Sequence, residues 1–137
     1  MARVRRQGNH RECEPVSRET FLSFTIPGKP VPCPRARVGR HGVHYPERYK
    51  QWRQDAVVEM HRQYEYEFPY WDCKVGMEVH FYGARANADI DNLLKSVLDA
   101  CSGFLYLDDR QVVEIHGYRH GNSKEANPRV EVKAWRM

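Results

Sequence analysis

Residues 71–103 read WDCKVGMEVHFYGARANADIDNLLKSVLDACSG, and the hydrophobic period of this stretch changes halfway along it. From Trp71 to Tyr82, apolar residues alternate with polar ones, which is typical of a half-buried strand. After Asp91, apolar residues recur with the three- and four-residue spacing of a helix, and Gly103 suits the position just beyond a helix end. A strand that leads into a helix is therefore the centre of the predicted fold.

The flanking sequence adds further strands and another helix. An aromatic and β-branched run over residues 21–26 predicts the first strand, and Pro46 begins an amphipathic helix that we expect over about residues 46–65. Two β-patterns near residues 112–118 and 130–135 predict a final hairpin. The expected fold is a single compact α+β domain over residues 19–137, with a mixed sheet and two helices in the order β-loop-α-β-α-β-β.

Charge is distributed unevenly along the 137 residues, although the formal net charge is only +4. Residues 1–53 contain 12 Lys and Arg against 4 Asp and Glu, and residues 54–137 contain 10 against 14, which recovers the totals of 22 and 18. A basic half favours a polyanionic partner and an acidic half favours metal ligands, so the charge suggests metal-dependent chemistry on nucleic acid. The alternative is that the two halves simply pair with each other.

The basic surplus is concentrated in two segments. Residues 1–18 are polar and Arg-rich, which predicts a flexible basic arm that is either an inert tail or a DNA contact. Residues 29–46, KPVPCPRARVGRHGVHYP, contain no acidic residue, and their prolines and glycines exclude a helix or a central strand. We interpret this segment as a phosphate-binding surface, with an ordinary solvated loop as the alternative. Its candidate DNA-binding residues are Lys29, Arg35, Arg37 and Arg40.

Cysteine usage and the N-terminal sequence bear on the compartment. The four cysteines are widely spaced, without the pairs expected of a zinc site or a disulfide framework, so they are predicted to be free thiols. No apolar segment follows the N-terminal basic residues, and no run approaches the roughly 20 apolar residues that a membrane helix needs. A cytoplasmic protein is expected, with neither a membrane nor a small-molecule cofactor as partner.

Carboxylates are densest between residues 83 and 111. Each one has a structural explanation: Asp91 as a helix cap, Lys95 in i,i+4 ion pairs with Asp91 and Asp99, and Asp108-Asp109 as a turn. A single cap leaves Asp89 unexplained, however, because it would repel Asp91 at close range unless a cation lay between them. Carboxylate oxygens are the ligands that Mg²⁺ prefers, so the cluster favours a divalent-metal site.

The same residues carry a family resemblance. The string DIDNLLKSVLDA followed by GFLYLDDRQ, together with FTIPGKPVPCPRAR near the beginning, closely resembles RusA-type Holliday junction resolvases over about residues 21–135. That family consists of small homodimeric Mg²⁺-dependent endonucleases, often encoded in phages and prophages. The resemblance implies a structure-selective endodeoxyribonuclease that resolves four-way DNA junctions by paired symmetric nicks in recombination and repair, with Mn²⁺ as a possible substitute for Mg²⁺.

Position by position, the resemblance implies particular roles. Asp89, Asp91 and Asp109 become metal-binding carboxylates, with Asp108 as an assistant or a substitute for Asp109. Lys95 corresponds to an essential lysine that reaches the scissile phosphate or the leaving oxygen. Two supporting residues complete the set: Asn92, which would orient a carboxylate or a water, and Asp99, a structural partner of Lys95.

Two alternatives remain at this stage. A non-catalytic DNA-binding module would use the same basic segment and treat the acids as caps and ion pairs. A metal-dependent nuclease that acts on another nucleic acid would keep the carboxylate site and change only the substrate.

Dimerisation is expected because two symmetric cuts suit a pair of sites related by a two-fold axis.

Overall fold

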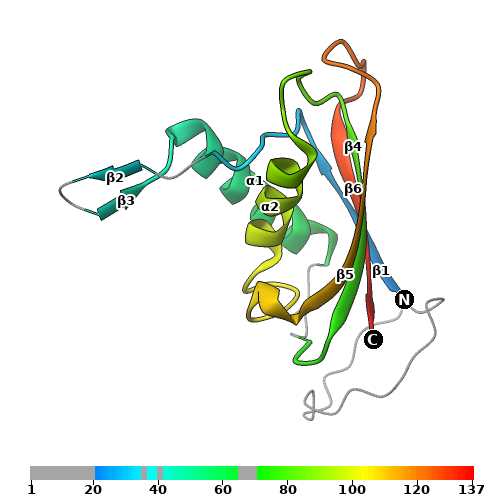
Figure 1. Ribbon diagram of the computed structural model, residues 1–137. Coiled ribbons are helices and arrows are strands. Elements are labelled where there is room, and N and C mark those ends of the chain that lie inside the picture. The colour runs from blue at the N-terminus through cyan, green and yellow to red at the C-terminus, as the bar shows by residue number, and fades with distance from the viewer. Residues whose placement is uncertain (1–20, 35–36, 40–41, 65–70) are drawn as a thin grey trace.

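The computed structural model describes residues 21–34, 37–39, 42–64 and 71–137, so the predicted arm over residues 1–18 lies outside the described part. Four strands, two helices and one 3₁₀ turn form the body, and a small hairpin is added to it (Figure 1). In chain order the elements are β1 (Phe21–Pro27), β2 (Arg37–Gly39), β3 (Gly42–His44), α1 (Glu47–Gln63), β4 (Val75–Tyr82), α2 (Ile90–Cys101), η1 (Asp109–Gln111), β5 (Val112–His120) and β6 (Arg129–Arg136).

The main sheet is mixed, with the strand order β1-β6-β4-β5. β4 is antiparallel to β6 and parallel to β5, because α2 carries the chain back along the sheet before β5 begins. Both helices cover one face of the sheet (Figure 1). The alternation predicted for β4 places Met77, Val79 and Phe81 under the helices, where all three are fully buried. The α+β class and the two-helix, mixed-sheet arrangement are confirmed.

The predicted final hairpin is wrong. β5 and β6 do not pair with each other, because β4 lies between them. The segment from Gly121 to Pro128 is long enough to carry the chain past the end of β4 to its other side. There β6 pairs with β4 and β1 together, from Val75↔Arg136 on one side and Phe21↔Trp135 on the other.

The basic segment contains regular structure that the sequence did not predict. β2 and β3 form a separate two-stranded ribbon in which Arg37 pairs with His44. This ribbon projects from the body beyond α1 (Figure 1). The expectation that the segment forms no central strand is consistent with this ribbon, which stands outside the main sheet.

Smaller differences concern boundaries and thiols. Pro46 is the N-cap of α1 and lies just before its first residue, and β4 begins at Val75, later than expected. Cys33 and Cys101 are free and buried, but Cys73 is disulfide-bonded, so the expectation of four free thiols is wrong at Cys73.

Within the described residues, neither helix has the length and apolar character needed to cross a membrane.

Candidate active site

Two carboxylates flank the start of α2. Asp89 is the N-cap residue, but its side chain makes no capping hydrogen bond. Asp91 lies in the first turn, where its Oδ1 accepts a hydrogen bond of 2.9 Å from the backbone N–H of Asn92. The side chains of both residues are exposed. Helix capping therefore explains neither carboxylate fully.

The loop that holds these carboxylates is fixed from two sides. The Arg119 side chain of β5 donates hydrogen bonds to the carbonyls of Arg85 and Ala88, directly before Asp89. From the other side, the backbone N–H of Cys33 donates to the carbonyl of Asn92 at 2.9 Å. The second bond attaches the basic segment at Cys33 to the first turn of α2, which also carries Asp91.

Lys95 lies one turn further along α2 and is paired with Asp99. Its Nζ lies 3.3 Å from Asp99 Oδ1, as the i,i+4 spacing predicted. Partial burial acts to lower the pKa of Lys95, but the charge and hydrogen bond of Asp99, with a smaller contribution from Asp109, outweigh it and raise that pKa above its usual value. The ammonium therefore keeps its charge at neutral pH, and its orientation is set by Asp99.

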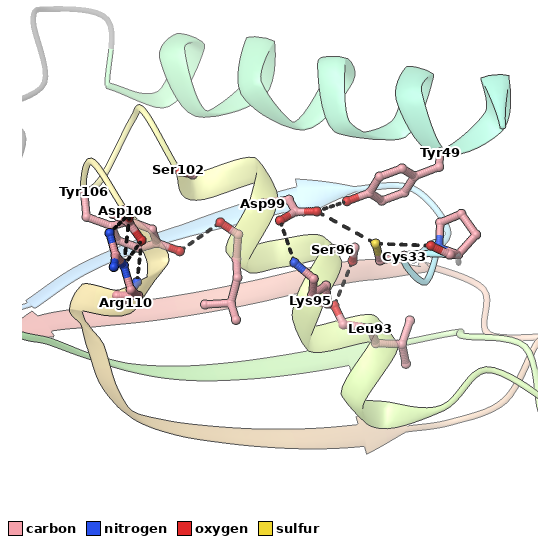
Figure 2. A network of polar contacts seen from close by, with 12 residues as sticks. Cys33, Tyr49, Leu93, Lys95, Ser96, Asp99, Ser102, Tyr106, Asp108 and Arg110 are labelled. Atoms are coloured by element: carbon pink, nitrogen blue, oxygen red, sulfur yellow. Dashed lines mark hydrogen bonds and ion pairs between the residues drawn. The ribbon is translucent and has the colours of Figure 1, made fainter. Parts of the chain in front are cut away.

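Asp99 is itself held from α1 and from the basic segment (Figure 2). The Tyr49 hydroxyl donates a hydrogen bond of 2.6 Å to Asp99 Oδ2, and the Cys33 thiol donates to the same oxygen at 3.8 Å. Burial and the bond to Asp99 raise the pKa of Tyr49, which keeps its hydroxyl protonated. The sequence does not predict this contact, because the helical spacing of an aromatic residue does not reveal where its hydroxyl points.

Asp108 and Asp109 have different environments. Asp108 caps η1: its carboxylate accepts hydrogen bonds from Arg110 at N (2.9 Å) and Nη2 (3.0 Å), and these bonds to Arg110 lower the pKa of Asp108. Gln111 completes a reciprocal capping box through the backbone N–H of Asp108 and also donates to the carbonyls of Trp71 and Cys73. Asp108 therefore has a structural role in this turn, which favours Asp109 as the third candidate ligand.

The candidate ligands do not all lie together in one chain. η1 follows the C-terminal end of α2, whereas Asp89 and Asp91 are at its N-terminal end. At about 1.5 Å per residue, the 12 residues of α2 span roughly 18 Å. Accordingly, no three carboxylate, imidazole or thiol groups among the described residues are grouped so that they could hold one metal ion. The pair at the start of α2 fits the one or two carboxylates that Mg²⁺ commonly takes from protein, with phosphate and water as its other ligands.

The predicted DNA-binding residues are only partly described. Lys29 donates from Nζ to the carbonyl of Ser123 at 3.3 Å, which places it at the end of the sheet where β5 finishes. Arg37 lies in β2, and Arg35 and Arg40 fall outside the described residues. The structure thus describes the backbone of two of the four candidates, Lys29 and Arg37.

Comparison with known proteins identifies the family. Residues 27–134 match the family model described as endodeoxyribonuclease RusA, and this range contains every acidic candidate, Lys95 and the basic segment from Lys29 onward. No curated protein matches the chain. Because the match covers nearly the whole chain and contains the site residues, the chain belongs to the RusA endodeoxyribonuclease family, the Holliday junction resolvases.

Proposed function

We propose that this protein is a homodimeric, Mg²⁺-dependent endonuclease that resolves four-way DNA junctions by paired symmetric nicks, with Mn²⁺ as an alternative ion. It would act on cytoplasmic DNA in recombination and repair. The observation that carries the proposal is the start of α2. There, Asp89 and Asp91 present carboxylate oxygens that capping does not use, one turn before a lysine whose charge is maintained by Asp99.

Asp89 and Asp91 would hold the metal ion. They are exposed, lie at the positive end of a helix and offer the hard oxygen donors that Mg²⁺ prefers. A bound Mg²⁺ would supply Lewis-acid polarisation of the phosphate and an acidified water. Asp109 would contribute the third carboxylate from the other copy in the homodimer, since α2 separates it from Asp89 and Asp91 within one chain and Asp108 is occupied by Arg110.

Lys95 would act on the phosphate itself. Its raised pKa keeps a proton on Nζ, so the ammonium can neutralise charge that develops on the phosphoryl oxygens or donate a proton toward the leaving 3′ oxygen. Asp99 orients that ammonium, and Tyr49 orients Asp99. Phosphates that flank the cut would bind the basic segment that begins at Lys29, because Cys33 attaches that segment to the first turn of α2.

One set of cleavage reactions tests this function. Labelled four-way junction, duplex DNA, single-stranded DNA and RNA are each incubated with Mg²⁺, Mn²⁺ or EDTA. We expect symmetric nicks in the junction with either metal and none in EDTA. Asp91→Asn should bind the junction but not cut it, and Asp55→Asn on α1, which removes an exposed carboxylate bonded to Gln51, should cut normally.

Three results would each overturn the proposal in a different way. Full cleavage by Asp91→Asn would exclude the carboxylate site. Junction binding that is independent of metal and never leads to cleavage would indicate a binding module. Preferential cleavage of RNA or single-stranded DNA would indicate a nuclease with another substrate.

A further inference from the structure

We propose that the groove between α1 and the C-terminal half of α2 binds an unpaired nucleotide of the cleaved DNA strand and sets the sequence preference of cleavage. This inference rests on the proposed function, because the groove adjoins the lysine that would act on the scissile phosphate. Its volume of about 890 Å³ is within the range of roughly 300–1,000 Å³ that is typical of small-molecule sites. Its walls include Lys50, Arg53, Gln54 and Val57 of α1 and Asp99 and Ser102 at the end of α2.

Asp99 connects the groove to the candidate active site. Its carboxylate lies between the two helices, where Oδ1 receives Nζ of Lys95 at 3.3 Å and Oδ2 receives the Tyr49 hydroxyl (Figure 2). A phosphate in contact with Lys95 therefore lies at the end of the groove that Asp99 forms. At about 1.5 Å per residue, the stretch from Lys95 to Ser102 spans roughly 10 Å, or about three nucleotides at about 3.4 Å each. The groove thus reaches nucleotides directly beside the proposed cut.

Two cations on the α1 wall suit the phosphates of this strand. Lys50 is exposed, and its ion-pair partner Glu47, at 3.8 Å, is exposed as well, so the pair is weak and leaves the ammonium available. Arg53 stacks over the Tyr49 ring at 5.4 Å, which orients the guanidinium and leaves its N–H groups free for phosphate oxygens. Asp99 is the one carboxylate among the described residues that line the groove, and both of its oxygens are already engaged.

The remaining lining suits a base. Val58 is 62% exposed and forms an apolar wall together with Val57. Tyr45 adds a half-buried ring that leans against Tyr49, with ring centroids 5.4 Å apart. Cations for phosphates beside an aromatic ring for bases are the combination by which proteins bind single-stranded DNA. Charge and lining together therefore favour a nucleotide as the occupant.

Gln54 is the residue that would read the base. Its side chain is exposed on the groove wall and has no hydrogen-bond partner among the residues that the structure describes. Its amide offers both a donor and an acceptor, so it can bond to two atoms of a base edge. Gln51, about one turn earlier on α1, donates instead to Asp55. Gln54 is therefore the determinant of sequence preference in this groove.

A branch point supplies the unpaired base that the groove needs. Within duplex DNA, extruding a base requires that its pair and its stacking be broken, and this cost is smallest where the base is already unpaired. The groove therefore favours DNA whose pairing is interrupted beside the cut. This preference agrees with the four-way junction as the proposed substrate.

Photo-cross-linking in EDTA tests occupancy of the groove without cleavage. Junctions that carry 5-iododeoxyuridine at one position each, from the branch point outward, are bound to the protein and irradiated. We expect a cross-link to Tyr45 from at least one position, its loss in Tyr45→Leu, and none from a fully paired duplex of the same sequence. No cross-link to Tyr45 from any bound junction, or an equal yield from the duplex, would overturn the proposal.

The same cross-link tests the two cations. The double variant Lys50→Ala with Arg53→Gln should lower its yield at least about fivefold at moderate salt, because two phosphate contacts are removed. Arg62→Ala removes a cation that is hydrogen-bonded to Glu59 near the end of α1 and should keep the wild-type yield. An unchanged yield in the double variant would contradict the assigned phosphate contacts.

Cleavage of a junction library tests Gln54. Junctions with randomised nucleotides around the branch point are cut with Mg²⁺, and the nicked ends are sequenced. The wild-type protein should prefer one base within about three nucleotides of the cut, and Gln54→Ala should lower that discrimination at least about fivefold. Gln51→Ala, the matched control, should keep it. A wild-type protein without preference, or an unchanged preference in Gln54→Ala, would overturn this role.

These readouts separate the two proposals. A protein that forms the Tyr45 cross-link in EDTA but never cuts a junction would overturn the proposed function and leave the nucleotide site standing. A protein that cuts junctions symmetrically, without the cross-link and with a preference independent of Gln54, would overturn the nucleotide site and leave the proposed function standing.

Discussion

The Tyr49 hydroxyl on α1 donates a hydrogen bond of 2.6 Å to Oδ2 of Asp99 on α2. Because the other oxygen of Asp99 receives Nζ of Lys95, a residue that is only 1% exposed sets the position of an exposed ammonium. The core contact between the two helices therefore extends to the candidate site through a single carboxylate.

Tyr49→Phe should lower the cleavage rate and leave junction affinity unchanged. The ring still fills the core, but Asp99 loses one donor and holds Lys95 less firmly. A net hydrogen bond contributes about 0.5–1.5 kcal/mol, so the loss in kcat should be up to about tenfold. Asp99→Asn should lower kcat further. Single-turnover cleavage and junction titration separate the two parameters, and Asp55→Asn is the control for loss of a helical carboxylate. If Tyr49→Phe kept its kcat and only lowered the melting temperature, the hydrogen bond between Tyr49 and Asp99 would contribute to stability alone.

Asp108→Asn and Asp109→Asn should have opposite effects, although the residues are adjacent. Asp108 is engaged by Arg110 and by the capping box, so its substitution should destabilise the fold by about 1 kcal/mol and spare most cleavage. Asp109→Asn should leave the melting temperature nearly unchanged and reduce cleavage at least about 100-fold, as expected when a charge-stabilising group is removed. Thermal melts and nicking rates of the two variants show which aspartate stabilises the fold and which one is needed for cleavage. If Asp108→Asn proved to be the inactive variant, the ligand assignment would be reversed.

Gly76→Ala should be a strongly destabilising change. Gly76 of β4 pairs with Trp135 of β6, and a Cβ at this position would lie 2.8 Å from Cζ2 of the buried indole. Overpacking of this kind costs about 1–3 kcal/mol. Gly117→Ala provides the comparison, because its Cβ would meet the end of the flexible Leu94 side chain at 3.0 Å. Urea unfolding should show the larger loss for Gly76→Ala; the reverse order would contradict the packing.

The sequence predicted the parts of this molecule that depend on local pattern. β4 and α2 were found because a period of two changes to a helical period between Tyr82 and Leu94, and the carboxylates were found with them. The hairpin predicted for β5 and β6 was wrong, because the place of β5 in the sheet depends on the crossover of α2 and not on the turn that joins the two strands. Likewise, adjacent aspartates look alike in the sequence until Arg110 and Gln111 are seen to engage Asp108.

The basic segment should control the salt dependence of junction binding. Each phosphate contact adds about 0.9 to the slope of log K against log salt concentration, so Lys29→Ala and Arg37→Ala should each reduce that slope by about 0.9. Arg62→Ala removes the same charge near the end of α1, where Arg62 is hydrogen-bonded to Glu59, and should leave the slope unchanged. Titration of the Asp91→Asn protein with labelled junction at several salt concentrations measures binding without cleavage. Equal slopes in all three variants would mean that the phosphates of the junction contact a different surface.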